Sequence, residues 1–242
     1  MLGNYGGPFC ILVAMGLLLA STIIGLWCFH LVWTLRFVDV LPTSLWTYVH
    51  VLVQAYLSTG LFITAHDAIH GTVLPSKKGN QIVGTIASFL FAGLSYSRLE
   101  RNHWRHHNNP AHDAADPDYH PSNTFIVWFG SFMLRYSTIW QFLVMGLAYN
   151  GLSLLLHIPE SRLWVFWIVP LFLAAFQLFM VGTYWPHRKP HSQDMPHNAR
   201  SMKKNHLLAM VACYFFGYHT EHHLSPRTPW WLLWKVKEER IS

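Results

Sequence analysis

The sequence predicts an all-α integral membrane protein: four transmembrane helices, shorter interfacial helices and a cytoplasmic cap rich in histidine. Hydrophobic residues make up 52% of the chain and charged residues only 12%, whereas a soluble domain has about 25% charged residues. The chain also contains 17 histidines, most of them between or after the apolar runs. Its 242 residues are expected to form a single domain, 1–242.

Four apolar runs without Asp, Glu, Lys or Arg predict the membrane spans. They extend from Phe9 to Phe29, from Leu45 to Ala65, from Ile139 to Leu156 and from Leu163 to Tyr184. The first would measure about 31 Å as a helix, enough to cross the hydrocarbon core. We therefore expect spans at about 9–29, 45–65, 139–156 and 163–184. Pro170 is expected to kink the last one, as membrane helices tolerate.

Three shorter apolar stretches are too short for full spans. They cover 82–96, 125–134 and 207–216, and we interpret them as interfacial or partly inserted helices.

The basic residues predict the orientation in the membrane. The connectors after the first and third spans carry only Arg36 and Arg162, whereas Gly71 to Ser137 and Trp185 to Ser242 hold most other Lys and Arg. The positive-inside rule places these two segments and both termini in the cytoplasm. We expect an integral membrane protein whose net charge of +6 reflects this topology rather than a nucleic-acid partner. No removable signal peptide is expected.

The cysteines predict no metal site or disulfide framework. Cys10, Cys28 and Cys213 form no CxxC pair, and we expect three buried apolar thiols.

Histidines recur at metal-ligand spacing in three places. His66 and His70 are four residues apart at the end of the second span. A helix brings residues i, i+3 and i+4 to one face, and Gly71 is suited to end that helix. The other two groups have the pattern HxxHH and comprise His103, His106, His107, His219, His222 and His223.

Eight imidazoles exceed the capacity of one ion, so two metals are the simpler interpretation. Zinc needs only three or four protein ligands. Such a site with open positions favours iron and O2 chemistry over hydrolysis. His187 follows the fourth span on the same side and is a candidate ninth ligand.

The remaining histidines receive no metal role. His30 and His157 are expected at the opposite face, and His50, about 24 Å from His66 along a helix, is expected to be packed or to line a cavity. His112, His120, His191, His197 and His206 stay unassigned.

Carboxylates beside the histidines are candidates for orienting them. Asp67, Asp116 and Asp118 are our candidate catalytic-site residues, and Asp113 and Glu221 also adjoin histidines. Direct iron ligation stays open, as does an ordinary turn at Asp116–Asp118.

The three boxes, HxxxH, HxxHH and HxxHH, resemble the di-iron signature of the membrane fatty-acid desaturase and hydroxylase superfamily. Within it, the chain is most similar to bacterial-type β-carotene ketolases. The resemblance rests on HDAIHG (66–71), NHWRHHNNPAHDAADPDYH (102–120), GTYWPHR (182–188) and GYHTEHHLSPRTPWWLL (217–233). The region 105–116 departs from that family's pattern, and the preference for substituted rings stays open.

The resemblance implies an O2-dependent oxidation at carbon 4 of the β-ionone ring. Two hydroxylations would give a geminal diol, which loses water to leave a ketone. β-Carotene would pass through echinenone to canthaxanthin, and zeaxanthin would lead to astaxanthin. The nine histidines would hold two irons, and ferredoxin would supply electrons.

Three alternatives stay open. A carotenoid hydroxylase or fatty-acyl desaturase of the same superfamily would share the motifs. A membrane haem protein would instead pair histidines on facing spans, and a metal transporter would need polar residues along the spans.

Overall fold

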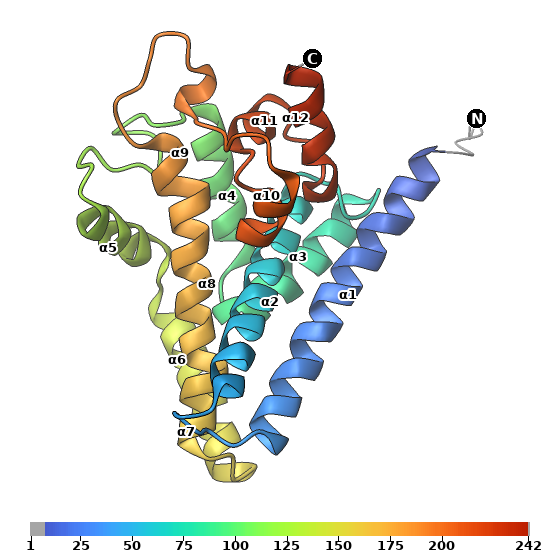
Figure 1. The fold of residues 1–242 in the computed structure, drawn as a ribbon, viewed down its shortest axis with the longest axis vertical. Coiled ribbons are helices and arrows are strands. Elements are labelled where there is room, and N and C mark those ends of the chain that lie inside the picture. Colours follow the sequence, from blue (N-terminus) through green and yellow to red (C-terminus); the bar gives the residue numbers. More distant parts are fainter. Residues whose placement is uncertain (1–7, 242) are drawn as a thin grey trace.

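Three long helical segments form the frame of the molecule. The computed structural model describes residues 8–241, and its elements there are helical. Helices α1 (Pro8–Phe37) and α2 (Leu45–Ile69) run along the long axis beside a third segment, which is continuous from Glu160 to His187 (Figure 1). That segment consists of α7 (Glu160–Leu163), η2 (Trp164–Ile168), α8 (Val169–Phe179), η3 (Met180–Tyr184) and α9 (Trp185–His187).

These three segments are long and apolar enough to cross a membrane. The qualifying lengths are 24 residues from Ala14 to Phe37, 25 in α2 and 28 from Glu160 to His187. They contain the predicted spans 45–65 and 163–184 and most of 9–29. α1 continues past His30, whose polar ring has a hydrogen-bond partner on the neighbouring helix: its Nδ1 lies 2.6 Å from Oε1 of Gln54 on α2.

The predicted span 139–156 is not among them. It corresponds to α6 (Ile139–Asn150) and the π turn η1 (Gly151–Leu155). α6 and η1 follow α5 (Phe125–Tyr136) after a bend of 82°. Only α5, α6 and η1 together are long and apolar enough to cross a membrane. The described chain therefore has three candidate spans, or up to five if each bent pair counts as one, and the predicted count of four is not confirmed.

The second bent pair carries the middle histidines. Helices α3 (Lys77–Ala92) and α4 (Tyr96–Asn108) meet at 100°. Gly93 ends α3 with φ of +67°, a conformation that costs glycine little. The stretch predicted as an isolated interfacial helix, 82–96, thus leads directly into the second histidine box. The stretch 207–216 contains α10 (His206–Cys213).

Pro170 is the second residue of α8, which directly follows the π turn η2. Proline has no N–H to donate within a helix, and a π turn is a known way to absorb such a local mismatch. The helical segment therefore continues through the predicted kink position.

α2 lies at the centre of the molecule. Ile63 and Leu61 on α2 and Phe166 on η2 are fully buried, while Leu18, Phe29 and Val32 on α1 are exposed. Such outward apolar side chains are expected where the surroundings are lipid. Helices α4, α9, α11 (His219–Leu224) and α12 (Leu233–Ile241) gather at one end of the frame, and α7 lies at the other (Figure 1).

Candidate metal centre

The nine candidate ligands come from four elements that meet at one end of the bundle. His66 lies in the last turn of α2 and His70 at its C-cap, and Gly71 (φ +73°) lets the chain turn away there. α4 supplies His103, His106 and His107, α9 supplies His187, and α11 supplies His219, His222 and His223. Eight of the nine are at least 92% buried, and His107 is half-buried.

The imidazoles form two groups, each with potential ligand atoms within 4.8 Å of one another. The first group consists of five rings: His66, His70, His103, His107 and His222. Its closest contacts join Nε2 atoms: 2.7 Å between His70 and His103, 2.8 Å between His107 and His222, and 3.2 Å between His66 and His222.

The second group consists of His106, His187, His219 and His223. Their Nε2 atoms follow one another at 3.2 Å (His106 to His223), 3.1 Å (His223 to His219) and 2.9 Å (His219 to His187). Because each group draws on α11 and α4, neither exists without the long-range fold.

The protons in the second group show that these rings fit a cation. His106 Nδ1 lies 2.9 Å from Asp116 Oδ2, and His187 Nδ1 lies 3.1 Å from the backbone oxygen of Asn198. In the neutral rings each Nδ1 donates to these oxygens, so each Nε2 presents a lone pair. The row of four Nε2 atoms therefore has a hydrogen-bond acceptor at each end. Ring protons cannot form a hydrogen bond at every contact in such a row, whereas a metal ion among these atoms can bind their lone pairs.

Burial favours the uncharged form of the rings, with one exception: burial acts to lower the pKa of His106, but the carboxylate of Asp116 outweighs it and raises that pKa. Burial lowers the pKa of His70 to about 3. Burial and neighbouring histidines hold the pKa values of His219, His222 and His223 well below the usual range. Neutral imidazole is the form that binds metal, so these rings are ready for binding near pH 7.

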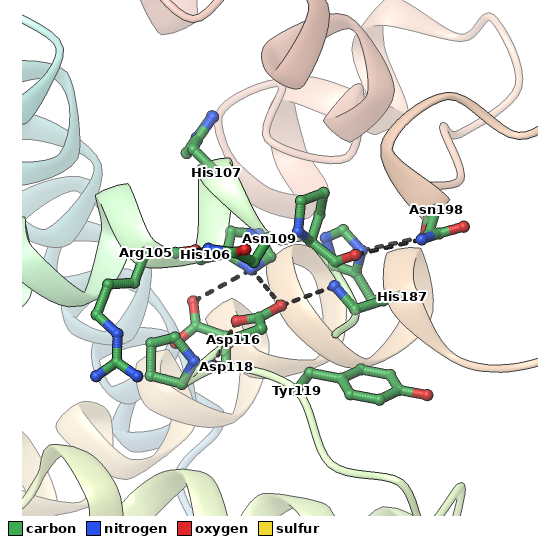
Figure 2. Close-up of polar contacts among 12 residues, drawn as sticks. Arg105, His106, His107, Asn109, Asp116, Asp118, Tyr119, His187 and Asn198 are labelled. Carbon is green, nitrogen blue, oxygen red and sulfur yellow. Dashed lines mark hydrogen bonds and ion pairs between the residues drawn. The ribbon is translucent and has the colours of Figure 1, made fainter. Parts of the chain in front are cut away.

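Figure 2 shows Asp116 and Asp118 beside His106, each with a contact to its ring. Asp116 also accepts from the backbone N–H groups of Ala111 and Asp118, each at 2.8 Å. Its stretch is thus both a turn and a support for His106, two of the alternatives that the sequence left open. Burial acts to raise the pKa of Asp116, but the contact with His106 outweighs it and the pKa is lowered. Burial raises the pKa of Asp118 to about 6.

Asp67 links α2 to the segment that follows the third histidine box. Its Oδ2 accepts a hydrogen bond from the backbone N–H of Trp230 at 3.0 Å, and its Oδ1 lies 3.4 Å from Nδ1 of His66. The second distance is long for a hydrogen bond, so its firmer link is to the segment that follows α11.

Several supporting residues were not predicted from the sequence. The Tyr136 hydroxyl donates to Asp118, and Arg135 donates to the backbone oxygens of Pro117 and Tyr119 at 2.9 and 2.8 Å. His197 stacks on His223 with ring centroids 5.4 Å apart. The side chains of α5 carry no sequence signal for this role, whereas His197 could have been found by its position between the last two boxes.

Other unassigned histidines have ordinary partners. His206 contacts Tyr218 and Glu238, His191 lies 2.8 Å from the backbone oxygen of His187, and His120 accepts from Ser122. His112 is exposed.

The structure separates His30, His50 and His157 from the centre. His30 and His50 contact each other at 3.1 Å between α1 and α2. His157 is exposed beyond η1. Among the cysteines, Cys213 is buried and Cys28 half-buried, and the side chain of Cys10 lies outside the described part of the chain.

Comparisons with known proteins point to one family. The model of the fatty acid desaturase family matches residues 43–157 and 128–241. Zeaxanthin 4-ketolase of Chlamydomonas reinhardtii is 38% identical over 97% of this chain, which spans 54% of that protein. Beta-carotene 4-ketolase 3 of Haematococcus lacustris is 36% identical over 91% of the chain and 78% of its own length. The beta-carotene ketolase of a Paracoccus species is 34% identical over 93% of both proteins.

No solved structure matches the chain. The family model covers most of the sequence, and the Paracoccus relative aligns nearly from end to end. The chain belongs to the fatty acid desaturase family, within which it is a relative of the β-carotene ketolases.

Proposed function

We propose that this chain is an O2-dependent di-iron oxygenase that converts carbon 4 of the β-ionone rings of β-carotene into a ketone. The observation that carries the proposal is the meeting of nine imidazoles in two groups, in a relative of β-carotene ketolases. An allylic C–H bond is the bond to be broken, so positioning decides which carbon reacts.

Each histidine group would hold one iron. His66, His70, His103, His107 and His222 would bind the first, and His106, His187, His219 and His223 the second. When bound, the two irons would supply the activation of O2 for C–H oxidation.

The chain's own groups hold and orient these ligands. Asp116 and the Asn198 carbonyl keep protons on Nδ1 of His106 and His187, so that Nε2 faces inward. The burial of the rings excludes water. The ligands lie on helices rather than loops, which holds them more precisely.

The overall reaction balances as two successive hydroxylations of one methylene carbon. Each consumes one O2, two electrons and two protons, replaces a C–H bond by a C–OH bond and releases one water. The resulting geminal diol loses a third water to leave the ketone. β-Carotene would give echinenone and then canthaxanthin, and zeaxanthin would give astaxanthin.

A cavity of about 560 Å³ is our candidate for substrate access. It lies between η3, the segment before α10 and α10 itself, and apolar side chains including Val181, Met202 and Ala212 line it. A Cβ on Gly217 would lie 2.1 Å from Met202 Sδ. Phe216, the neighbour of Gly217 in the chain, lies with its ring centroid 4.9 Å from that of His66 and 5.2 Å from that of His219.

The location and the electron source are part of the proposal. We propose a bacterial inner-membrane enzyme whose metal centre faces the cytoplasm, because the segments 71–137 and 185–242 hold most basic residues and seven of the nine histidines. Membrane lipid surrounds its spans, ferredoxin delivers electrons, and no nucleic acid takes part.

Two other functions fit the geometry less well. Nε2 atoms 2.7 to 3.2 Å apart leave no space for a porphyrin plane between them, which argues against haem. The hydroxyls of Ser58, Thr59 and Thr64 in α2 bond to carbonyls of their own helix, which argues against a polar transport path. A carotenoid hydroxylase or acyl desaturase is the alternative, because it would share the histidine motifs.

The test is to express the chain in cells that make β-carotene and to identify the extracted pigments. We expect echinenone and canthaxanthin from the natural sequence and none from His106→Ala. His157→Ala, which alters an exposed histidine at the other end, is the matched control and should keep the activity. Hydroxylated pigment without ketone would favour the alternative, and no oxidised pigment in iron-replete cells would refute the proposal.

A further inference from the structure

The outer face of α4 carries an exposed aromatic side chain between two arginines. Arg101, Trp104, Arg105 and Asn108 are exposed and share one side of the helix by their i, i+3 and i+4 spacing. Trp104 exposes 38% of its surface. The face is otherwise polar, so lipid does not explain it.

The inner edge of Trp104 touches the first histidine group. Its ring centroid lies 5.1 Å from that of His70, 5.8 Å from His107 and 6.5 Å from His103. Trp104 therefore connects the protein surface with three of the five rings of that group through direct side-chain contact.

The two arginines lack partners, unlike several other cations on this side of the molecule. Lys204 pairs with Glu238, and Lys237 and Arg240 pair with Glu221. Among the residues that the structure describes, neither the Arg101 nor the Arg105 guanidinium forms an ion pair or a hydrogen bond. Tryptophan and arginine are the residues most enriched at energetically important interface positions, and uncompensated charge speeds the approach of an oppositely charged partner.

We propose that the Arg101–Trp104–Arg105 face of α4 is the docking site of an acidic one-electron carrier protein, with Trp104 as its contact to the first histidine group. The inference rests on the proposed function, because each ketone requires four electrons from outside the chain. Four carrier molecules are each oxidised by one electron per ketone, and the electrons enter the reduction of O2 to water.

The experiment compares two charge reversals in the full-length, iron-loaded protein in β-carotene-containing liposomes. The variant Arg101→Glu/Arg105→Glu is matched by Lys77→Glu/Lys78→Glu, an exposed pair at the start of α3. Ketone formation is measured with a reduced plant-type [2Fe–2S] ferredoxin and, separately, with dithionite, and the ratio of the two rates is the readout.

We expect the arginine variant to raise the KM for ferredoxin about tenfold or more and to flatten its dependence on ionic strength. Its ferredoxin-to-dithionite ratio should fall, while the lysine variant keeps the ratio of the natural protein. Trp104→Leu should lower kcat at saturating ferredoxin with a smaller effect on KM. A purely structural role of Trp104 would not change kcat selectively in this way.

Other outcomes have separate meanings. Unchanged ferredoxin kinetics in the arginine variant, or an equal loss in both variants, would overturn the docking site. Loss of binding to anionic liposomes, with unchanged ferredoxin kinetics, would reassign this face to the membrane surface and also overturn it. Failure of the natural protein to form ketone with either reductant would instead reject the proposed function.

Discussion

Asp116 is the side chain through which the α4–α5 loop controls His106. It is 2% exposed and accepts three hydrogen bonds, from His106 Nδ1 and from the backbone N–H groups of Ala111 and Asp118. Both carboxylate oxygens are therefore committed to donors. A group in this position fixes the tautomer and direction of a metal ligand.

We expect Asp116→Asn to weaken metal binding about 10- to 100-fold. The new NH2 group must face either the Asp118 N–H or the pair from His106 and Ala111, so at least one donor loses its acceptor, which costs about 1–3 kcal/mol for each buried donor. Iron content after dialysis against a graded chelator measures the effect. Asp113→Asn, exposed in the same loop, is the control, and equal iron retention in both variants would contradict the role.

The histidine spacing predicted which imidazoles meet, because a helix fixes i, i+3 and i+4 neighbours locally. It could not predict how they divide into two groups. His106 and His107 are adjacent in sequence, yet the first belongs to the four-ring group and the second to the five-ring group. Tyr136, Arg135 and the Asn198 carbonyl escaped prediction because their contacts depend on how distant segments fold together.

At the scale of elements, α12 stabilises the position of α11. Glu221 of α11 is fully buried and accepts from Lys237 at 3.1 Å and Arg240 at 2.9 Å, both on α12, as well as from Ser201. Burial acts to raise the pKa of Glu221, but these hydrogen bonds hold it below its usual value. The C-terminal helix therefore secures the turn that carries three of the nine histidines.

Lys237→Met should destabilise this junction. Removing one partner of a buried ion pair costs about 3–5 kcal/mol, and the remaining contact with the more exposed Arg240 should reduce that loss. Thermal unfolding of the detergent-solubilised protein and its iron content should both decrease. Lys235→Met changes an exposed lysine two residues away on α12 and should leave both unchanged. Identical behaviour of the two variants would show that α12 does not secure α11.

The cavity beside α10 supports a second prediction at this scale. Ala212 lines it, whereas Leu207, on the same helix, is 77% exposed and lies outside it. Ala212→Trp should fill the space and lower ketone formation strongly, with iron content unchanged because no histidine is touched. Leu207→Trp adds bulk outside the cavity and should keep the activity. Full activity of Ala212→Trp would show that substrate reaches the centre by another route.

For the whole molecule, the apolar runs predicted the positions of three span candidates well, because burial in lipid leaves a strong local signal. The same signal at 139–156 is not confirmed as a separate span. An apolar run does not reveal that the chain bends by 82° between α5 and α6, since the bend lies at Ser137 and Thr138, outside the run. The apolar runs therefore leave the number of crossings between three and five. The side of the membrane on which the histidines lie is predicted from the distribution of charge.

The positive-inside rule gives a topology that can be measured directly. Gln193 is exposed in the segment between α9 and α10, near the histidines, and Ser161 is exposed in α7 at the other end. In a background without the three natural cysteines, Ser161→Cys should react with a membrane-impermeant maleimide in spheroplasts. Gln193→Cys should react only after the membrane is permeabilised. The proposed function requires electrons from a cytoplasmic ferredoxin, so labelling of Gln193→Cys in intact spheroplasts would contradict it by placing the metal centre on the opposite side of the membrane.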